Sequence, residues 1–214
     1  PAKLRGKYST PINTFNSLIY ADPEKTILVG HGKRVAENLV IPEGVKEIVE
    51  DTFVDCLAIK TVKFPSTLEK IGKNAFAGCG RLTNIMIPDS VEVIGGSAFL
   101  NCDSLKTVVI GDGVKTVGDK AFAGCEDLTS IVFKNSITYL GVSAFEGCKK
   151  LDAVTFEKDC EQIAKHAFRG CTALESITLP DSITQIGSSA FANTGLHTFT
   201  VPKETKVLSS SLFS

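Results

Sequence analysis

A phenylalanine recurs every 23 residues along most of this 214-residue chain. The first six are each followed three positions later by a cysteine, and the seventh is followed by Thr194. The pairs are Phe53/Cys56, Phe76/Cys79, Phe99/Cys102, Phe122/Cys125, Phe145/Cys148 and Phe168/Cys171, with Phe191 as the seventh ring. A fixed period of this length is typical of a solenoid, in which each coil packs only against its neighbours. The sequence therefore predicts one continuous body of stacked coils.

The repeat can be divided into segments with different expected structures. Aligned along the chain, it reads I-P-x-S-V-x-x-I-G-x-x-A-F-x-G-C-x-x-L-x-x-I-x. The segment L-x-x-I-x-I alternates inward and outward positions, which favours a short strand. One such strand per coil would stack into a parallel sheet. We expect V-x-x-I-G to form a second short strand on the opposite side, and A-F to begin a single tight helical turn.

The position two residues after each phenylalanine is always Gly, Asn or Asp. These residue types tolerate a left-handed backbone, so the chain should reverse here with a positive φ. The positions are Asp55, Gly78, Asn101, Gly124, Gly147, Gly170 and Asn193.

Both ends depart from the repeat. Residues 1–35 are predicted to be an extended lead-in and a capping β-hairpin, whose strands at 17–20 and 26–29 flank an Asp-Pro turn. Residues 36–214 hold about seven repeats and a partial eighth. Gly195-Leu196 shortens the seventh by one residue, and no polar cap follows residues 208–213. We expect either that the native chain continues or that this edge is buried, and self-association through it is a hypothesis.

The seven cysteines are interpreted as reduced, buried residues. Six follow the repeat, and Cys160 occupies a position that is Val, Ile or Leu in other coils. Stacked cysteine side chains would point the same way, whereas a disulfide needs converging Cβ vectors. No disulfide is therefore expected. No C-x2-C pair occurs and His31, His166 and His197 fall at unrelated repeat positions, so neither a metal site nor a cofactor is predicted.

The repeat unit resembles the BspA-like, or Treponema pallidum-type, leucine-rich repeat over residues 36–213. The resemblance implies a right-handed, curved leucine-rich-repeat solenoid. It also implies a cell-surface or secreted protein that takes part in adhesion to host or neighbouring-cell proteins. It implies no catalytic residues, and it does not identify a ligand.

Two columns of strand residues should face solvent on the L-x-x-I-x-I sheet. One contains an apolar stretch that merges into threonines, which suggests a platform for a protein or glycan partner. The simpler interpretation is that β-branched residues occur there because they suit strands. The candidate ligand-binding residues are Lys63, Asn84, Met86, Thr107, Val109, Ser130, Val132, Thr155 and Thr178.

Composition and motifs argue against several functions. With 23 basic and 24 acidic residues and no basic run, nucleic acid is not an expected partner. No apolar run is long enough for membrane insertion. The glycine-containing string at 111–118 lacks the G-K-[ST] ending of a phosphate loop. No catalytic constellation is recognisable, so an enzyme is not expected.

The sequence thus favours a non-enzymatic, surface or secreted module that binds a protein or glycan. A structural spacer that holds other domains away from a cell surface is the alternative, and an intracellular assembly protein is a third possibility. The chain begins with Pro1 and shows no signal sequence, so we expect targeting information to have been removed.

Overall fold

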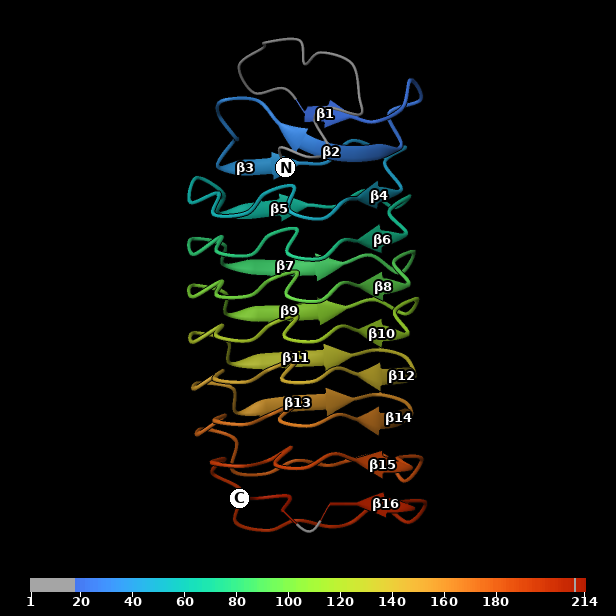
Figure 1. The fold of residues 1–214 in the computed structure, drawn as a ribbon, viewed down its shortest axis with the longest axis vertical. Coiled ribbons are helices and arrows are strands. Elements are labelled where there is room, and N and C mark those ends of the chain that lie inside the picture. Colours follow the sequence, from blue (N-terminus) through green and yellow to red (C-terminus); the bar gives the residue numbers. More distant parts are fainter. Residues whose placement is uncertain (1–17, 210) are drawn as a thin grey trace.

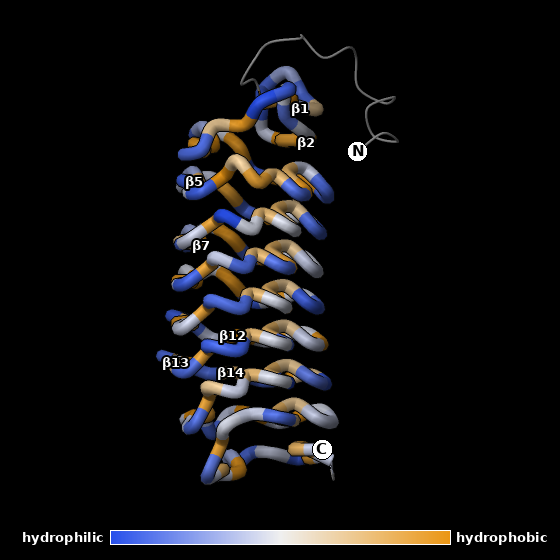
Figure 2. Tube along the Cα trace, turned by 90° about the vertical axis from the view of Figure 1, so that its left-hand side faces the viewer, coloured by the Kyte–Doolittle hydropathy of each residue, from blue (hydrophilic) through white to orange (hydrophobic). Residues whose placement is uncertain are grey.

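The computed structural model describes residues 18–209 and 211–214 as an elongated column of stacked coils (Figure 1). Two sheets run along the column, and within the described residues there is no helix. Seen after a quarter turn, the coils lie one on another from end to end (Figure 2). The solenoid predicted from the 23-residue period is confirmed.

The first sheet has ten strands and is built mainly from the V-x-x-I-G segments. Its strands pair in parallel, except that β1 and β2 are antiparallel. In order along the sheet they are β1 (Leu18–Tyr20), β2 (Ile27–His31), β4 (Glu47–Ile48), β6 (Lys70–Ile71), β8 (Val93–Ile94), β10 (Thr116–Val117), β12 (Ile137–Leu140), β14 (Cys160–Ile163), β15 (Gln185–Ile186) and β16 (Val207–Leu208).

The second sheet has six parallel strands and is built from the L-x-x-I-x-I segments. They are β3 (Asn38–Val40), β5 (Thr61–Lys63), β7 (Asn84–Ile87), β9 (Thr107–Ile110), β11 (Ser130–Phe133) and β13 (Ala153–Phe156). The prediction of a strand over 174–179 is wrong, because the structure assigns none there. Ile177 and Leu179 are only half-buried, so the inward positions of this segment are less enclosed than those of the strands before it.

The hairpin predicted near the N-terminus is present. Strands β1 and β2 pair antiparallel, and β2 continues in parallel onto β4. Asp22 in the connection accepts hydrogen bonds from the backbone of Thr26 and Ile27 at 2.9 and 2.7 Å. These bonds lower the pKa of Asp22, although its partial desolvation acts in the opposite direction. The predicted lead-in over residues 1–17 lies outside the described residues.

The A-F segment is a run of hydrogen-bonded turns, and the predicted helical turn is not observed there. The amide of Phe76 donates to the carbonyl of Ala98 in the next coil at 2.8 Å, while Cys79 donates to Phe76 at 3.2 Å. Every second amide of this segment thus donates its hydrogen bond to a carbonyl of the next coil. These amides are not available for the i→i−4 hydrogen bonds of an α-helix. The positive φ predicted two residues after each phenylalanine is confirmed. A second positive φ, two residues before it, was not predicted and includes Asn74 at 52°.

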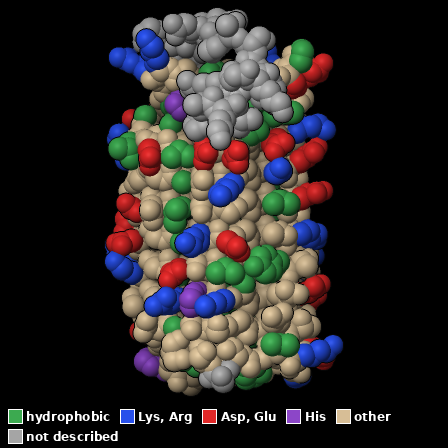
Figure 3. Space-filling model, viewed as in Figure 1, with side chains coloured by type: hydrophobic (Ala, Val, Ile, Leu, Met, Phe, Trp, Pro, Cys, Tyr) green, Lys and Arg blue, Asp and Glu red, His purple; other side chains and the backbone are tan. Residues whose placement is uncertain are grey.

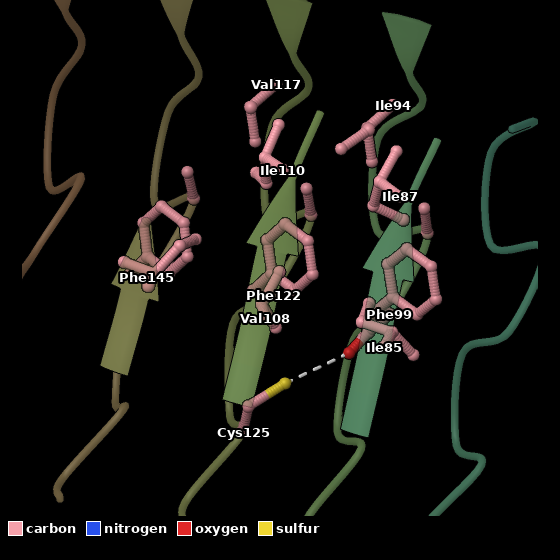
Figure 4. Packing of buried hydrophobic residues seen from close by; sticks show 14 of the residues in the cluster. Ile85, Ile87, Ile94, Phe99, Val108, Ile110, Val117, Phe122, Cys125 and Phe145 are labelled. Atoms are coloured by element: carbon pink, nitrogen blue, oxygen red, sulfur yellow. Dashed lines mark hydrogen bonds between the residues drawn. The ribbon is translucent and has the colours of Figure 1, made fainter. Parts of the chain in front are cut away.

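The repeated rings and thiols fill the interior. The seven phenylalanines are fully buried, and consecutive rings stack with centroids 5.0–5.5 Å apart. Each ladder thiol from Cys79 to Cys171 donates to the carbonyl of the phenylalanine 26 residues earlier, as Cys125 does to Phe99 at 3.2 Å (Figure 4). The core is therefore continuous along the column.

Truncation of a central ring tests this core. Phe122→Ala should lower the free energy of unfolding by about 3–5 kcal/mol, because the neighbouring coils cannot collapse into the cavity. Leu57→Ala is the control, since Leu57 is 60% exposed and should change stability by less than about 0.5 kcal/mol. Urea unfolding followed by circular dichroism measures both. Equal, small effects would contradict the continuous aromatic core.

Candidate binding surface

The outward face of the six-stranded sheet is formed by alternate residues of its strands. In β9, for example, Val108 and Ile110 are buried while Thr107 is exposed and Val109 is half-buried. We call this face the platform. Its first column is Asn38, Thr61, Asn84, Thr107, Ser130 and Ala153, and its second is Val40, Lys63, Met86, Val109, Val132 and Thr155.

The structure brings together eight of the nine residues predicted to bind a ligand. All nine are exposed or half-buried. Thr178 is exposed too but lies beyond the strands of the sheet, so it is not part of the platform. Sequence reasoning missed Asn38 and Val40, which extend both columns by one strand. The alternating N-L-V-I-P segment that precedes the first full repeat was the signal for them.

The first column is polar except for Ala153, and two pairs of its side chains are hydrogen-bonded to each other. Thr61 donates from Oγ1 to Oδ1 of Asn38 at 2.8 Å, and Thr107 donates in the same way to Asn84 at 2.7 Å. Each pair is one repeat apart, so the contact recurs because the register between strands is constant. These bonds hold the polar edge of the platform in a fixed arrangement.

The second column contains a contiguous apolar strip. Met86 is the register partner of Val109, which is the partner of Val132. Neighbouring strands lie about 4.8 Å apart, so the three side chains adjoin. Met86 is 66% exposed, more than any other large apolar residue among those described. Lys63 borders the strip on one side, because Thr61 pairs with Asn84 two residues earlier on each strand, and Thr155 borders it on the other.

Charges are paired between neighbouring coils. Lys60 contacts Glu37 at 2.6 Å beside the platform, and Lys150 contacts Asp127 at 2.7 Å. In both cases the lysine bond lowers the pKa of the carboxyl group. Figure 3 shows acidic and basic side chains interspersed on the face of the column that it displays. Such exposed pairs contribute little stability individually, but they neutralise each other locally.

The cysteines are free thiols, and all except Cys56 are buried. Burial raises the pKa of Cys125 and Cys171 to about 12. The half-buried thiol of Cys56 contacts the imidazole of His31, a contact that sequence reasoning missed because His31 lies outside the repeat pattern. Within the described residues, no group of three or more His, Cys, Asp or Glu side chains is placed to hold a metal ion. No helix in that part of the chain is long and apolar enough to cross a membrane.

Comparison with known proteins identifies the repeat. Six copies of the BspA type leucine rich repeat region match residues 32–152 and 93–214. The chain belongs to the BspA-type leucine-rich repeat family. No curated protein matches this BspA-type chain.

Solved structures agree with this assignment. A leucine-rich repeat protein from Eubacterium ventriosum is 30% identical with a TM-score of 0.79, over 87% of this chain and 50% of that one. This BspA-type chain thus spans about half the length of that protein. The T. pallidum leucine rich repeat protein is 26% identical with a TM-score of 0.67, over 86% of this chain and 88% of that one. The pneumococcal vaccine antigen PcpA is 27% identical with a TM-score of 0.54, over 84% and 48%.

The alternation that creates the platform can be tested on adjacent residues of this BspA-type coil. Val109→Lys should change the free energy of unfolding by less than about 1 kcal/mol, because the lysine ammonium reaches solvent. Val108→Lys should cost several times as much, since it buries an unpaired charge. Thermal or urea unfolding of both variants gives the comparison. Similar losses for the two would contradict the assigned faces.

Proposed function

We propose that this chain is a non-enzymatic binding module whose platform holds a protein of a host or neighbouring cell. The observation that carries the proposal is the outward apolar strip formed by Met86, which is exposed, and by Val109 and Val132, which are half-buried. Exposed apolar side chains that adjoin across several strands are typical of interaction sites. A protein rather than a glycan is favoured because the strip offers apolar contact area, while Thr107 and Asn84 in the neighbouring polar column are already hydrogen-bonded to each other.

The partner segment that fits this surface is apolar with an acidic neighbour. Lys63 adjoins the strip in the second column, and Lys106 precedes the strand that carries Val109. Both lysines are exposed. A carboxylate beside an apolar anchor would meet these ammonium groups, which would favour correct orientation and faster association.

The stacked coils supply the mechanism of binding. Their backbones are fixed by hydrogen bonds between coils, and the polar column is held by its Thr–Asn contacts. A surface that is already ordered loses little conformational entropy when a partner binds. A location at the cell surface or in secreted form is part of the proposal. Its support is the family and the likeness to a protein described as a vaccine antigen.

A spacer function, in which the column only separates other domains, is the alternative. It requires no partner on the platform. The binding experiment below therefore separates the two functions.

Charge introduced into the strip should abolish partner binding. Met86→Lys and Val109→Lys should each weaken binding to a captured protein at least about 10-fold, because an ammonium group would be desolvated against an apolar anchor. Pull-down from host-cell or matrix proteins, followed by titration of the captured protein, measures the effect.

The matched control is Thr116→Lys, which places the same charge in the same coil on the ten-stranded sheet. It should leave affinity unchanged. If a captured partner binds both platform variants as well as the unchanged protein, the platform is not its binding site. If signals on a glycan array depend on Met86 and Val109 instead, the ligand of the platform is a glycan and not a protein.

We also propose that copies of this chain associate through β16. This strand pairs with β15 on one side, and the described residues provide no strand for its other side. Val207 and Leu208 are 54% and 43% exposed. An exposed apolar edge strand is a template for pairing with a second copy.

Light scattering at rising concentration tests this association. We expect the 214-residue chain to form dimers, and Leu208→Lys to return it to monomer by placing charge at the edge. Leu57→Lys, at the other end of the column, should not. A monomer at all concentrations would contradict the proposal.

A further inference from the structure

Cys56 differs from the ladder cysteines in the group that accepts its hydrogen bond. The thiols from Cys79 to Cys171 each donate to a backbone carbonyl. The Sγ atom of Cys56 lies 3.2 Å from Nε2 of His31. A carbonyl oxygen is not a useful base, whereas the unprotonated nitrogen of a neutral imidazole is one. The first thiol of the ladder therefore has a base where the others have none.

The imidazole is held in the tautomer that can accept this proton. Nδ1 of His31 lies 2.7 Å from the carbonyl oxygen of Gly32. Because a carbonyl can only accept, Nδ1 carries the hydrogen, and in the neutral ring Nε2 has its lone pair free for the thiol. The ring also stacks on Phe53 at 5.5 Å with an interplanar angle of 5°, which fixes its orientation. A thiol, a base and a group that orients the base are thus aligned.

The pair opens onto solvent. Cys56 and His31 are both half-buried, whereas the other six thiols are buried. A cavity of about 340 Å³ adjoins them, and its lining among the described residues includes the cationic side chains of Lys33 and Arg34. The lining residues are His31, Lys33, Arg34, Val35, Cys56, Leu57 and Ala58.

We propose that Cys56 is a modification site at which His31 promotes thiol–disulfide exchange with small anionic disulfides. His31 Nε2 takes the thiol proton as Cys56 Sγ attacks one sulfur of R–S–S–R. The Sγ–S bond forms as the S–S bond of the reagent breaks, and the leaving thiolate takes the proton from the imidazolium. The products are the mixed disulfide Cys56–S–S–R and R–SH, so the reagent is the oxidant and no other is needed.

The need for a base follows from the surroundings of the thiol. Burial, followed by the charge of Asp55, raises the pKa of Cys56 to about 11. A free thiolate is consequently scarce at neutral pH, and proton transfer during attack is the route that remains. Cys79 has its pKa raised to about 12 and has only a carbonyl as acceptor. It lies one coil deeper in the same ladder, so it is the internal reference.

The experiment is residue-resolved mapping of the native protein after exposure to glutathione disulfide, a reagent with carboxylate groups. Mass spectrometry of quenched, digested samples should find Cys56 modified at least about 100-fold faster than Cys79 and the other buried thiols. The same reaction in denaturant should modify all seven at similar rates. Modification of Cys56 no faster than of Cys79 in the native protein would overturn the proposal without any variant being needed.

Two comparisons separate the role of His31 from simple exposure. His31→Phe keeps a ring to stack on Phe53 but removes the base, and should slow modification of Cys56 about 10-fold or more. His31→Gln, which keeps an acceptor without a base, should slow it similarly. Unchanged rates in folded samples of both variants would overturn the role of His31. Cystamine, a cationic disulfide, should react more slowly than glutathione disulfide, and equal or faster reaction would overturn the assigned reagent class.

Discussion

The structure depends on backbone hydrogen bonds that join each coil to the next. In the turn segment, the amide of each phenylalanine from Phe53 to Phe168 donates to an alanine carbonyl 22 residues ahead, always at 2.8 Å. A single coil contains too few internal hydrogen bonds to satisfy its buried backbone, so it cannot be stable alone. The rings and thiols then have to repeat at the same spacing, because they are attached to backbones that do.

This constraint also shapes the surface. A residue on the outside of one coil meets its counterpart 23 residues later, so side-chain contacts occur in columns. Ion pairs such as Lys149–Glu126 and hydrogen bonds such as Thr107–Asn84 arise in this way. The apolar strip of the platform has the same origin, since Met86, Val109 and Val132 occupy one repeat position. A column therefore offers a partner a row of side chains at fixed spacing.

Much of the fold could be predicted because the repeat itself carries the information. The buried phenylalanines, the strand segments and the left-handed position after each ring all follow from residue types at fixed positions. The conformation of the A-F turns could not be predicted from the sequence. Amides such as that of Phe76 donate to a carbonyl in another coil, and no local sequence pattern indicates such a hydrogen bond. The left-handed Asn74 shares its position with Ser97, Lys120 and His166, so residue type gave no signal there.

For the platform, the sequence predicted which residues face outward but not what binds to them. Alternation placed Met86 and Val109 outward, whereas their partner depends on molecules outside the chain. The contact between Cys56 and His31 was missed because His31 follows the position, Gly30, that would hold a phenylalanine one repeat before Phe53. Its ring nevertheless continues the aromatic stack. That His31 takes the place of a stacked phenylalanine is visible only in the three-dimensional structure.

Native-state hydrogen exchange of the phenylalanine amides tests the central dependence on bonds between coils most directly. In the central coils, the amides of Phe76, Phe99, Phe122 and Phe145 should exchange slowly and at similar rates, with opening free energies close to that of global unfolding. Exchange of these amides as fast as that of exposed turn amides would show that the coils do not hold one another together, and would contradict the account.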